Sequence, residues 1–214
     1  MSKILYSSQE NYLKNLRTEN DELILEMEKF SKENNVPILD WNSAELLEQL
    51  IRLHKPKRVL EIGTAIAYST IRIAKNLKKK AIIDTLENNV ENIKLAEEYI
   101  KRSGVGNKIN IINGDALQKM PELKIKYNFI FLDADKEDYE RLFYYSLMLL
   151  KKGGVLFVDN LLWHGYAGNK VVPAKYKLTT QKIREFNKLF ISQYSLKTTI
   201  LPVGDGIGIG IKKD

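Results

Sequence analysis

The first 56 residues carry hydrophobic side chains at helical spacing. Apolar positions between residues 10 and 33 recur roughly every three, four or seven residues and predict one amphipathic helix. These positions are Leu13, Leu16, Leu23, Met27 and Phe30. We expect a turn at Pro37 and then a helix through Leu53. Ser43 is its predicted N-cap, because a serine hydroxyl accepts hydrogen bonds from the first free backbone N–H groups.

From residue 57 onward, short apolar runs alternate with amphipathic segments. Strands are predicted at residues 58–63, 81–87, 109–115, 127–133 and 154–160, and helices at 68–77, 89–104, 138–154 and 175–192. Gly104 stands where the second of these helices would stop. Two further strands flank a turn at Gly204-Asp205-Gly206 and predict a hairpin. This alternation predicts an α/β fold, a Rossmann-like and mostly parallel sheet with helices on both faces and a C-terminal antiparallel hairpin.

The composition is that of an ordinary globular protein. The chain has 214 residues, of which 44% are hydrophobic and 29% charged, so we expect one domain over residues 1–214. Residues 1–56 would form its helical segment and residues 57–214 its sheet. We expect a cytoplasmic protein without membrane contact, because the sequence shows neither a membrane span nor a signal peptide. The absence of cysteine excludes disulfides, thiolate catalysis and cysteine-based zinc sites.

A surplus of positive charge lies toward the C-terminus. The net charge is +7, and the last 64 residues hold 11 basic side chains against 4 acidic ones. Such a surplus attracts polyanions such as nucleic acids, but it is equally typical of a solvated, lysine-rich surface. The charge alone leaves both interpretations open.

Each of the five expected strands before the hairpin ends in or near a carboxylate. These residues are Glu61, Glu87, Asp115, Asp133 and Asp159, and Asn160 follows the last of them. Ligands of open α/β sheets bind outside the carboxyl ends of the strands. One such carboxylate is commonly a helix cap or a turn residue, but five at one edge repel one another unless cations or polar ligands neutralise them.

The loop after the first strand indicates a nucleoside ligand without a diphosphate. The stretch "EIGTAIAYS" has one glycine, Gly63, and lacks the G-x-G-x-x-G pattern, which disfavours a nicotinamide dehydrogenase. Glu87 ends the second strand, where a carboxylate contacts ribose hydroxyls in nucleoside-binding sheets.

Several stretches together resemble a known family. "VLEIGTAIAYST", "TLENN", "INGDA", "FLDADKEDY" and "LFVDN" are similar to the metal-dependent O-methyltransferases that include catechol and caffeoyl-CoA O-methyltransferases, over about residues 36–214. Among them, the compact chain most resembles bacterial tRNA 5-hydroxyuridine methyltransferases. The resemblance implies a seven-stranded sheet that binds S-adenosylmethionine. It also implies a bound metal ion (Mg²⁺ or Mn²⁺) and assembly into a homodimer. Ala67 departs from the glycine that the family often has at this place.

The resemblance also implies roles for individual residues. Contacts to the cofactor would come from Ile38, Glu61, Gly63, Ser69, Glu87, Asp115, Ala116 and Asp133. Of these, Glu61, Gly63 and Ser69 would lie at its methionine end, Glu87 at its ribose, and Asp115 with Ala116 at its adenine. The implied metal ligands are Asp133, Asp159 and Asn160, and Lys136 would be the general base.

This ligand set agrees with simple coordination chemistry. Carboxylate and amide oxygens suit a hard divalent ion, which lowers the pKa of a hydroxyl bound to it. The same positive charge would lower the pKa of Lys136 and let its amine accept a proton. The alternative is structural, with Asp133 capping the helix near residue 138 and Asp159 forming an Asx turn with Asn160.

Chelation by one ion requires two neighbouring oxygens on the acceptor, which both catechol and 5-hydroxyuridine provide. The segment after Asn160 interleaves aromatic with basic residues, namely Trp163, Tyr166 and Tyr176 with Lys170, Lys175, Lys177, Lys182 and Arg184. Aromatic rings stack on unpaired bases while basic groups meet phosphates, so we favour tRNA as the partner. His164 would lie at the rim of the pocket. The alternatives are a lid over a small phenolic acceptor, and a non-catalytic tRNA-binding module, which would leave Asp133, Lys136 and Asp159 unexplained.

Overall fold

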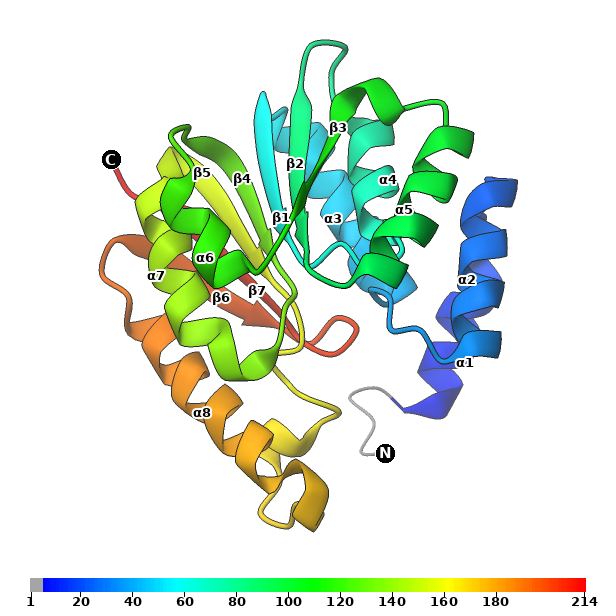
Figure 1. Ribbon diagram of the computed structural model, residues 1–214. Helices are drawn as coiled ribbons and strands as arrows, with labels where there is room; N and C mark the ends of the chain where they lie inside the picture. Colours follow the sequence, from blue (N-terminus) through cyan, green and yellow to red (C-terminus); the bar gives the residue numbers. More distant parts are fainter. Residues whose placement is uncertain (1–5) are drawn as a thin grey trace.

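A computed structural model describes residues 6–214 (Figure 1). Its helices are α1 (Ser7–Leu16), α2 (Glu22–Asn34), α3 (Trp41–His54), α4 (Tyr68–Asn76), α5 (Val90–Arg102), α6 (Ala116–Lys119), α7 (Tyr139–Leu149) and α8 (Lys177–Ser192). Its strands are β1 (Arg58–Ile62), β2 (Ile82–Glu87), β3 (Ile109–Asn113), β4 (Tyr127–Leu132), β5 (Leu150–Val158), β6 (Leu196–Leu201) and β7 (Ile207–Lys212). Residues 1–5 of the predicted helical segment lie outside the described residues.

The strands form one seven-stranded sheet in the order β3-β2-β1-β4-β5-β7-β6. Neighbours from β3 to β5 pair in parallel, whereas β7 runs antiparallel to both β5 and β6. The predicted fold class is therefore confirmed, including the C-terminal hairpin. Because the parallel strands share one direction, their carboxyl ends meet at a single edge.

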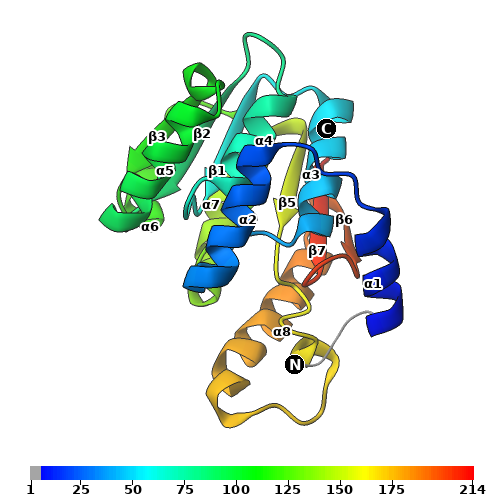
Figure 2. The same cartoon turned by 90° about the vertical axis from the view of Figure 1, so that its right-hand side faces the viewer.

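Helices cover both faces of the sheet and give it two apolar layers (Figures 1 and 2). On one face, Phe129 and Phe131 of β4 pack in a core with α3, α4 and α5. On the other face, Ile130 and Leu132 of the same strand pack with α7 and α8. Side chains of a strand alternate between its two sides, so these consecutive residues serve both layers.

The N-terminal helices differ from the sequence-based prediction. The single helix over residues 10–33 is wrong, because the chain forms α1 and α2 with a non-helical stretch between them. Asp21 starts α2 by accepting hydrogen bonds from the backbone N–H groups of Leu23 (3.1 Å) and Ile24 (3.4 Å). Ser43 is not the cap of α3 either, since the Asp40 carboxylate accepts from the Asn42 N–H at 3.0 Å.

The helix predicted over residues 138–154 is also too long. α7 ends at Leu149, and β5 begins at the next residue. Leu150 pairs with Tyr127, and a register shift follows before Val155 pairs with Phe129. Pairing with β4 thus overrides the helical pattern that predicted a helix up to residue 154.

The end of α5 is as predicted: the helix ends at Arg102, and Gly104 has a left-handed φ of +72°.

A network of ion pairs around the buried Arg72 joins the N-terminal helices to α4. The Arg72 side chain of α4 is 3% exposed and lies 3.0 Å from Glu19 and 2.6 Å from Glu48. Its guanidinium also donates to the Tyr68 hydroxyl at 3.1 Å, and that hydroxyl donates to Glu28 at 2.5 Å. The segment between α1 and α2 is therefore fixed against α4, the helix that follows the loop after β1.

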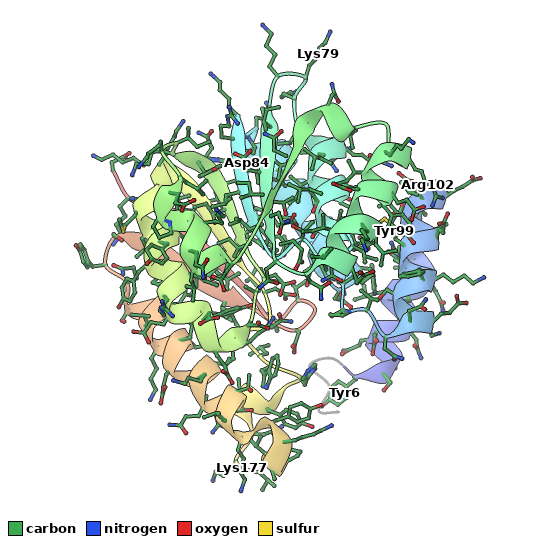
Figure 3. The ribbon with its side chains drawn as sticks, in the orientation of Figure 1. Tyr6, Lys79, Asp84, Tyr99, Arg102 and Lys177 are labelled. Atoms are coloured by element: carbon green, nitrogen blue, oxygen red, sulfur yellow. The ribbon has the colours of Figure 1, made fainter. Side chains whose placement is uncertain are left out.

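Helix α2 also packs against α5. The rings of Phe30 and Tyr99 lie 6.2 Å apart, and Arg102 forms a hydrogen-bonded ion pair with Glu26. Figure 3 shows Tyr99 and Arg102 on the side of α5 that faces α2. Within residues 6–214, no helix combines the length and apolar character needed to cross a bilayer.

We predict that Arg72→Ala lowers the free energy of unfolding by about 3 kcal/mol, because it removes the ion pair of the partly buried Glu48 and leaves Glu19 and Glu28 with Arg17 alone of their two arginine partners. Urea denaturation followed by circular dichroism measures the change. Lys94→Ala is the matched control, since Lys94 forms an exposed ion pair on α5, and its loss should cost less than about 0.5 kcal/mol. Equal effects of the two substitutions would contradict a structural role for the buried network.

Candidate functional site

A cavity of about 440 Å³ opens at the carboxyl edge of the sheet, over the ends of β1, β2 and β4. Most residues predicted to bind the cofactor or to catalyse line it, namely Ile38, Gly63, Ser69, Glu87, Asp115, Ala116, Asp133 and Lys136. Three predicted residues do not belong to its lining. Glu61 is fully buried and contacts Ser69 of the lining, while Asp159 and Asn160 directly follow the end of β5.

Gly63 allows the loop after β1 to touch the end of β4. Its φ is +101°, and a methyl group at this position would lie 2.0 Å from the carbonyl oxygen of Asp133. The Asp133 N–H donates in turn to the Ile62 carbonyl at 3.0 Å. Glycine is thus required here by backbone conformation and by packing. Ala67 ends the same loop in the left-handed region, with φ +67°, a conformation that favours glycine.

Glu61 is fully buried and holds the helix that borders the cavity. Its carboxylate accepts hydrogen bonds from Ser69 (2.6 Å), Thr85 (2.6 Å) and Thr70. Burial, opposed by these hydrogen bonds and assisted by the Asp133 charge, raises the pKa of Glu61 to about 7. The side chain therefore positions Ser69 from below, and its direct contact with a cofactor stays a prediction.

Two further carboxylates at the edge accept hydrogen bonds from backbone N–H groups. Glu87 accepts from Ala65 (2.8 Å), which ties the loop after β1 to the end of β2, and from Asn88 and Asn89. Asp115 caps α6 and accepts from Leu117 at 2.7 Å. Both side chains nevertheless line the cavity, so the structural role and the predicted binding role coexist.

Asp133 and Lys136 form a close pair at the other end of the cavity. The Lys136 ammonium lies 3.0 Å from both the Asp133 carboxylate and the Ala134 carbonyl. Burial lowers the pKa of Lys136, but the negative charges of Asp133 and Asp159 outweigh it, so the pKa is raised. The expected lowering therefore requires an added positive charge. Asp133 is not a helix cap, because Asp138 precedes α7 and makes no side-chain cap.

Asp159 and Asn160 bring more negative charge to this end of the edge. Asp159 is 4% exposed, and burial, together with the charge of Asp133, raises its pKa. One of its carboxylate oxygens accepts from the Asn160 N–H at 2.7 Å. Asn160 has a left-handed φ of +62°, and its side-chain amide donates to Asp205 at 3.4 Å. Asp205 lies in the turn between β6 and β7, where the sequence pattern predicts a turn and gives no sign of this contact.

The predicted metal ligands have suitable chemistry for a divalent ion. The charges of Asp133 and Asp205 both oppose ionisation of Asp159, whereas Lys136 favours it, and His164 and Lys136 favour ionisation of Asp205. Two carboxylates and an amide oxygen are ligands that Mg²⁺ and Mn²⁺ accept. Within residues 6–214, however, no three His, Cys, Asp or Glu side chains converge as a metal site does. The donor set thus fits such an ion, and its presence stays a prediction.

The aromatic residues after Asn160 pack on one another. The Tyr166 and Tyr176 rings stack with centroids 5.2 Å apart, and His164 lies against both. The ring centroids of Trp163 and His164 lie 4.9 Å apart. Arg184, predicted to face phosphates, instead donates to the carbonyl groups of the loop at residues 166, 167 and 169. This guanidinium stabilises the loop and is already engaged.

Comparison with known proteins decides the family. The sequence model described as O-methyltransferase matches residues 8–213, almost the whole chain. This chain belongs to the O-methyltransferase family. The predicted enzyme class is therefore confirmed.

Individual relatives of this O-methyltransferase agree with the assignment. Catechol O-methyltransferase of Niastella koreensis is 29% identical, and the alignment covers 100% of both chains. Caffeoyl-CoA O-methyltransferase 1 of Arabidopsis thaliana is 33% identical over 82% of this chain and 71% of its own. A Staphylococcus aureus crystal structure, provisionally assigned as a caffeoyl-CoA O-methyltransferase, has a TM-score of 0.89 at 31% identity and covers 96% of this chain and 100% of its own. The predicted closeness to tRNA methyltransferases stays a prediction.

We predict that Glu61 makes the stability of this O-methyltransferase depend on pH. Because the pKa of Glu61 is raised to about 7 by burial, the folded state retains a proton that the unfolded state releases above about pH 4.5. The contribution of Glu61 to the free energy of unfolding therefore falls as pH rises from about 4.5 to 7, by up to roughly 1.4 kcal/mol per pH unit.

Glu61→Gln removes this titration, so urea denaturation of both proteins between about pH 5 and 8 provides the measurement. The stability of the unsubstituted protein relative to the variant should decrease across this range and level off above it. Parallel stability curves would contradict the burial argument.

Proposed function

We propose that this O-methyltransferase transfers the methyl group of S-adenosylmethionine to a hydroxyl oxygen of an acceptor held at a divalent metal ion. The observation that carries the proposal is the cavity itself, which extends from Glu87 and Asp115 at one end to Asp133 and Lys136 at the other. A related Bacillus cereus O-methyltransferase has been solved in complex with SAH, at 25% identity and a TM-score of 0.83 over 97% of this chain and 98% of its own.

On the cofactor side, the residues of the chain bind and orient. Ser69, held by Glu61, faces the proposed methionine end, and Glu87 is held rigidly enough by Asn88 and Asn89 to accept from ribose hydroxyls. Asp115 and Ala116 lie at the proposed adenine end, and Ile38 contributes an apolar wall. Positioning of this kind supplies several kcal/mol toward the barrier of a transfer reaction, on the order of 7–11 at best.

On the acceptor side, residues of the chain would hold the metal ion and accept a proton. Asp133, Asp159 and Asn160 would hold Mg²⁺ or Mn²⁺, whose charge would lower the pKa of an acceptor hydroxyl. Lys136 would accept that proton at its Nζ atom, which lies 3.0 Å from Asp133. The hydrogen bond from Tyr139 to the Asp159 carbonyl, at 3.1 Å, keeps the end of β5 in place for this arrangement.

We predict that EDTA abolishes methyl transfer and that Mg²⁺ or Mn²⁺ restores it. Asp133→Ala and Lys136→Ala should each lower kcat by at least about 100-fold, the lower range of a general base contribution, while circular dichroism stays unchanged. Transfer of the labelled methyl group of S-adenosylmethionine is the measurement. Lys124→Ala removes an exposed charge elsewhere and should have no effect. Activity of either site variant near that of the control would refute the mechanism.

For the acceptor, we propose 5-hydroxyuridine at the wobble position of tRNA. Support comes from Lys170, Lys175, Lys177 and Lys182, which are exposed and form no ion pair among residues 6–214. Lys170 and Lys175 lie in the segment between β5 and α8, and Lys177 and Lys182 lie in the first half of α8. The Lys175 ammonium lies 4.6 Å from the centre of the Tyr176 ring. A basic surface with aromatic rings beside a proposed catalytic centre suits a single-stranded RNA loop.

A small catechol-like or phenolic acceptor is the second candidate. The relatives named above are described as acting on catechol and caffeoyl-CoA, which favours this chemistry. The mutual stacking of Tyr166 and Tyr176 also suits a lid over a small ring.

We predict label from S-adenosylmethionine in tRNA that carries 5-hydroxyuridine, and none in tRNA without it. The double variant Lys175→Ala/Lys177→Ala should weaken tRNA binding and reduce its salt dependence by about one ion per lost phosphate contact. Lys78→Ala/Lys79→Ala is the matched control, because Figure 3 places Lys79 and Lys177 at opposite ends of the molecule. Label in catechols alone would reverse the order of the two candidates.

We also propose a homodimer. The support is α1, which buries none of its residues and leaves Tyr12 64% and Leu16 59% exposed. Apolar side chains of this size on one helix suit a protein partner.

A further inference from the structure

The turn between β6 and β7 is locked onto the loop that follows β5. The backbone N–H groups of Leu161 and Leu162 donate to the carbonyls of Gly206 (2.9 Å) and Asp205 (2.8 Å). A methyl group at Gly206, whose φ is +91°, would lie 2.5 Å from the Leu162 nitrogen. Only glycine permits this approach, so the backbone of Asp205 is fixed beside the loop.

The Asp205 side chain uses both of its oxygens on that loop. One oxygen accepts from the His164 N–H at 2.5 Å, and the other accepts from the Asn160 side-chain amide at 3.4 Å. The side chain is only 18% exposed. An ionised carboxylate can only accept, so it must face the NH₂ end of the Asn160 amide. The carbonyl oxygen of that amide then points away from Asp205.

We propose that Asp205 is a positioning residue, which sets the amide of Asn160 so that its oxygen rather than its NH₂ group faces the acceptor side of the site. This inference rests on the proposed function in so far as Asn160 is a metal ligand there. The orientation matters because the amide oxygen binds a cation and the NH₂ group repels one. Loss of a residue that orients a metal ligand typically lowers the affinity for the metal 10- to 100-fold.

The isosteric substitution Asp205→Asn tests this role. The introduced amide can still accept from the His164 N–H, but its NH₂ group then meets the NH₂ group of Asn160, and the Asn160 amide must turn. We expect the affinity for Mn²⁺ alone, measured by titration calorimetry, to fall at least tenfold. The affinity for S-adenosylmethionine should stay within about twofold, because Asp205 does not line the cavity. Glu97→Gln, an exposed carboxylate lost from α5, is the control of equal charge change.

A swap of the two side chains separates positioning from general stability. In Asn160→Asp/Asp205→Asn the total charge is unchanged, and the carboxylate introduced at position 160 accepts from the amide introduced at position 205 while its second oxygen remains for a cation. We expect Mn²⁺ affinity to return to within about threefold of the unsubstituted protein. The proposal is overturned if D205N binds Mn²⁺ normally, or if the swap binds as weakly as D205N alone.

A readout without metal distinguishes this inference from the proposed function. The side-chain amide protons of Asn160, assigned in NMR spectra by their loss in N160D, should exchange with solvent at least tenfold faster in metal-free D205N. Equal exchange rates would overturn the role of Asp205. If the unsubstituted protein binds no Mn²⁺ while the exchange rates differ as expected, the metal proposal fails and the positioning of Asn160 by Asp205 holds.

Discussion

The contact between Gly63 and Asp133 is the constraint on which the site depends. A side chain at residue 63 would collide with the Asp133 carbonyl, so the ends of β1 and β4 approach only because residue 63 is glycine. This approach joins the loop that follows β1 to the turn that carries Asp133 and Lys136, and a single cavity then spans both. Separation of the two strand ends would divide the cavity into a half lined by Glu87 and Asp115 and a half lined by Asp133 and Lys136.

Charge imposes the second constraint, because the edge of the sheet concentrates carboxylates that the fold does not fully neutralise. Glu87 and Asp115 are stabilised by backbone N–H groups, and Glu61 by three hydroxyls. At the other end, Lys136 offsets Asp133 and Asp159, and His164 and Lys136 offset Asp205, yet the pKa values of Asp159 and Asp205 are raised, mainly by burial. Hydrogen bonds from backbone N–H groups thus stabilise the carboxylates where a nucleoside is proposed to bind, whereas buried carboxylates gather where a cation is proposed.

The sequence was sufficient for those features that follow from local pattern. Alternating strands and helices identify the sheet and its hairpin, and parallel strands bring the residues at their ends to one edge. Ser43 illustrates the limit: serine is a good N-cap, but Asp40 three residues earlier starts the helix, and the Ser43 hydroxyl is buried against the turn at Gly204. A distant packing contact, which the local pattern does not contain, selects between two good caps.

The same limit explains the residues missed or misassigned in the site. Arg184 belongs to a basic stretch and was therefore assigned to phosphates, yet its position on α8 directs it to three carbonyls of the loop. Asp205 stands between two glycines, a pattern that predicts a turn and conceals a contact with Asn160 formed across 45 residues. Such roles depend on which segments meet in the folded chain, and single-sequence periodicity carries no information about that.

The cavity and the loop that follows β5 are supported by different parts of the chain. The cavity lies at the ends of the parallel strands and is fixed from the N-terminal side through Arg72, Glu19 and Tyr68. The loop after β5 does not line the cavity and is fixed instead by α8 and the β6–β7 turn. Under the proposed function this loop contacts the acceptor, so substitutions in it would change the choice of acceptor while the residues of the cavity stay as they are.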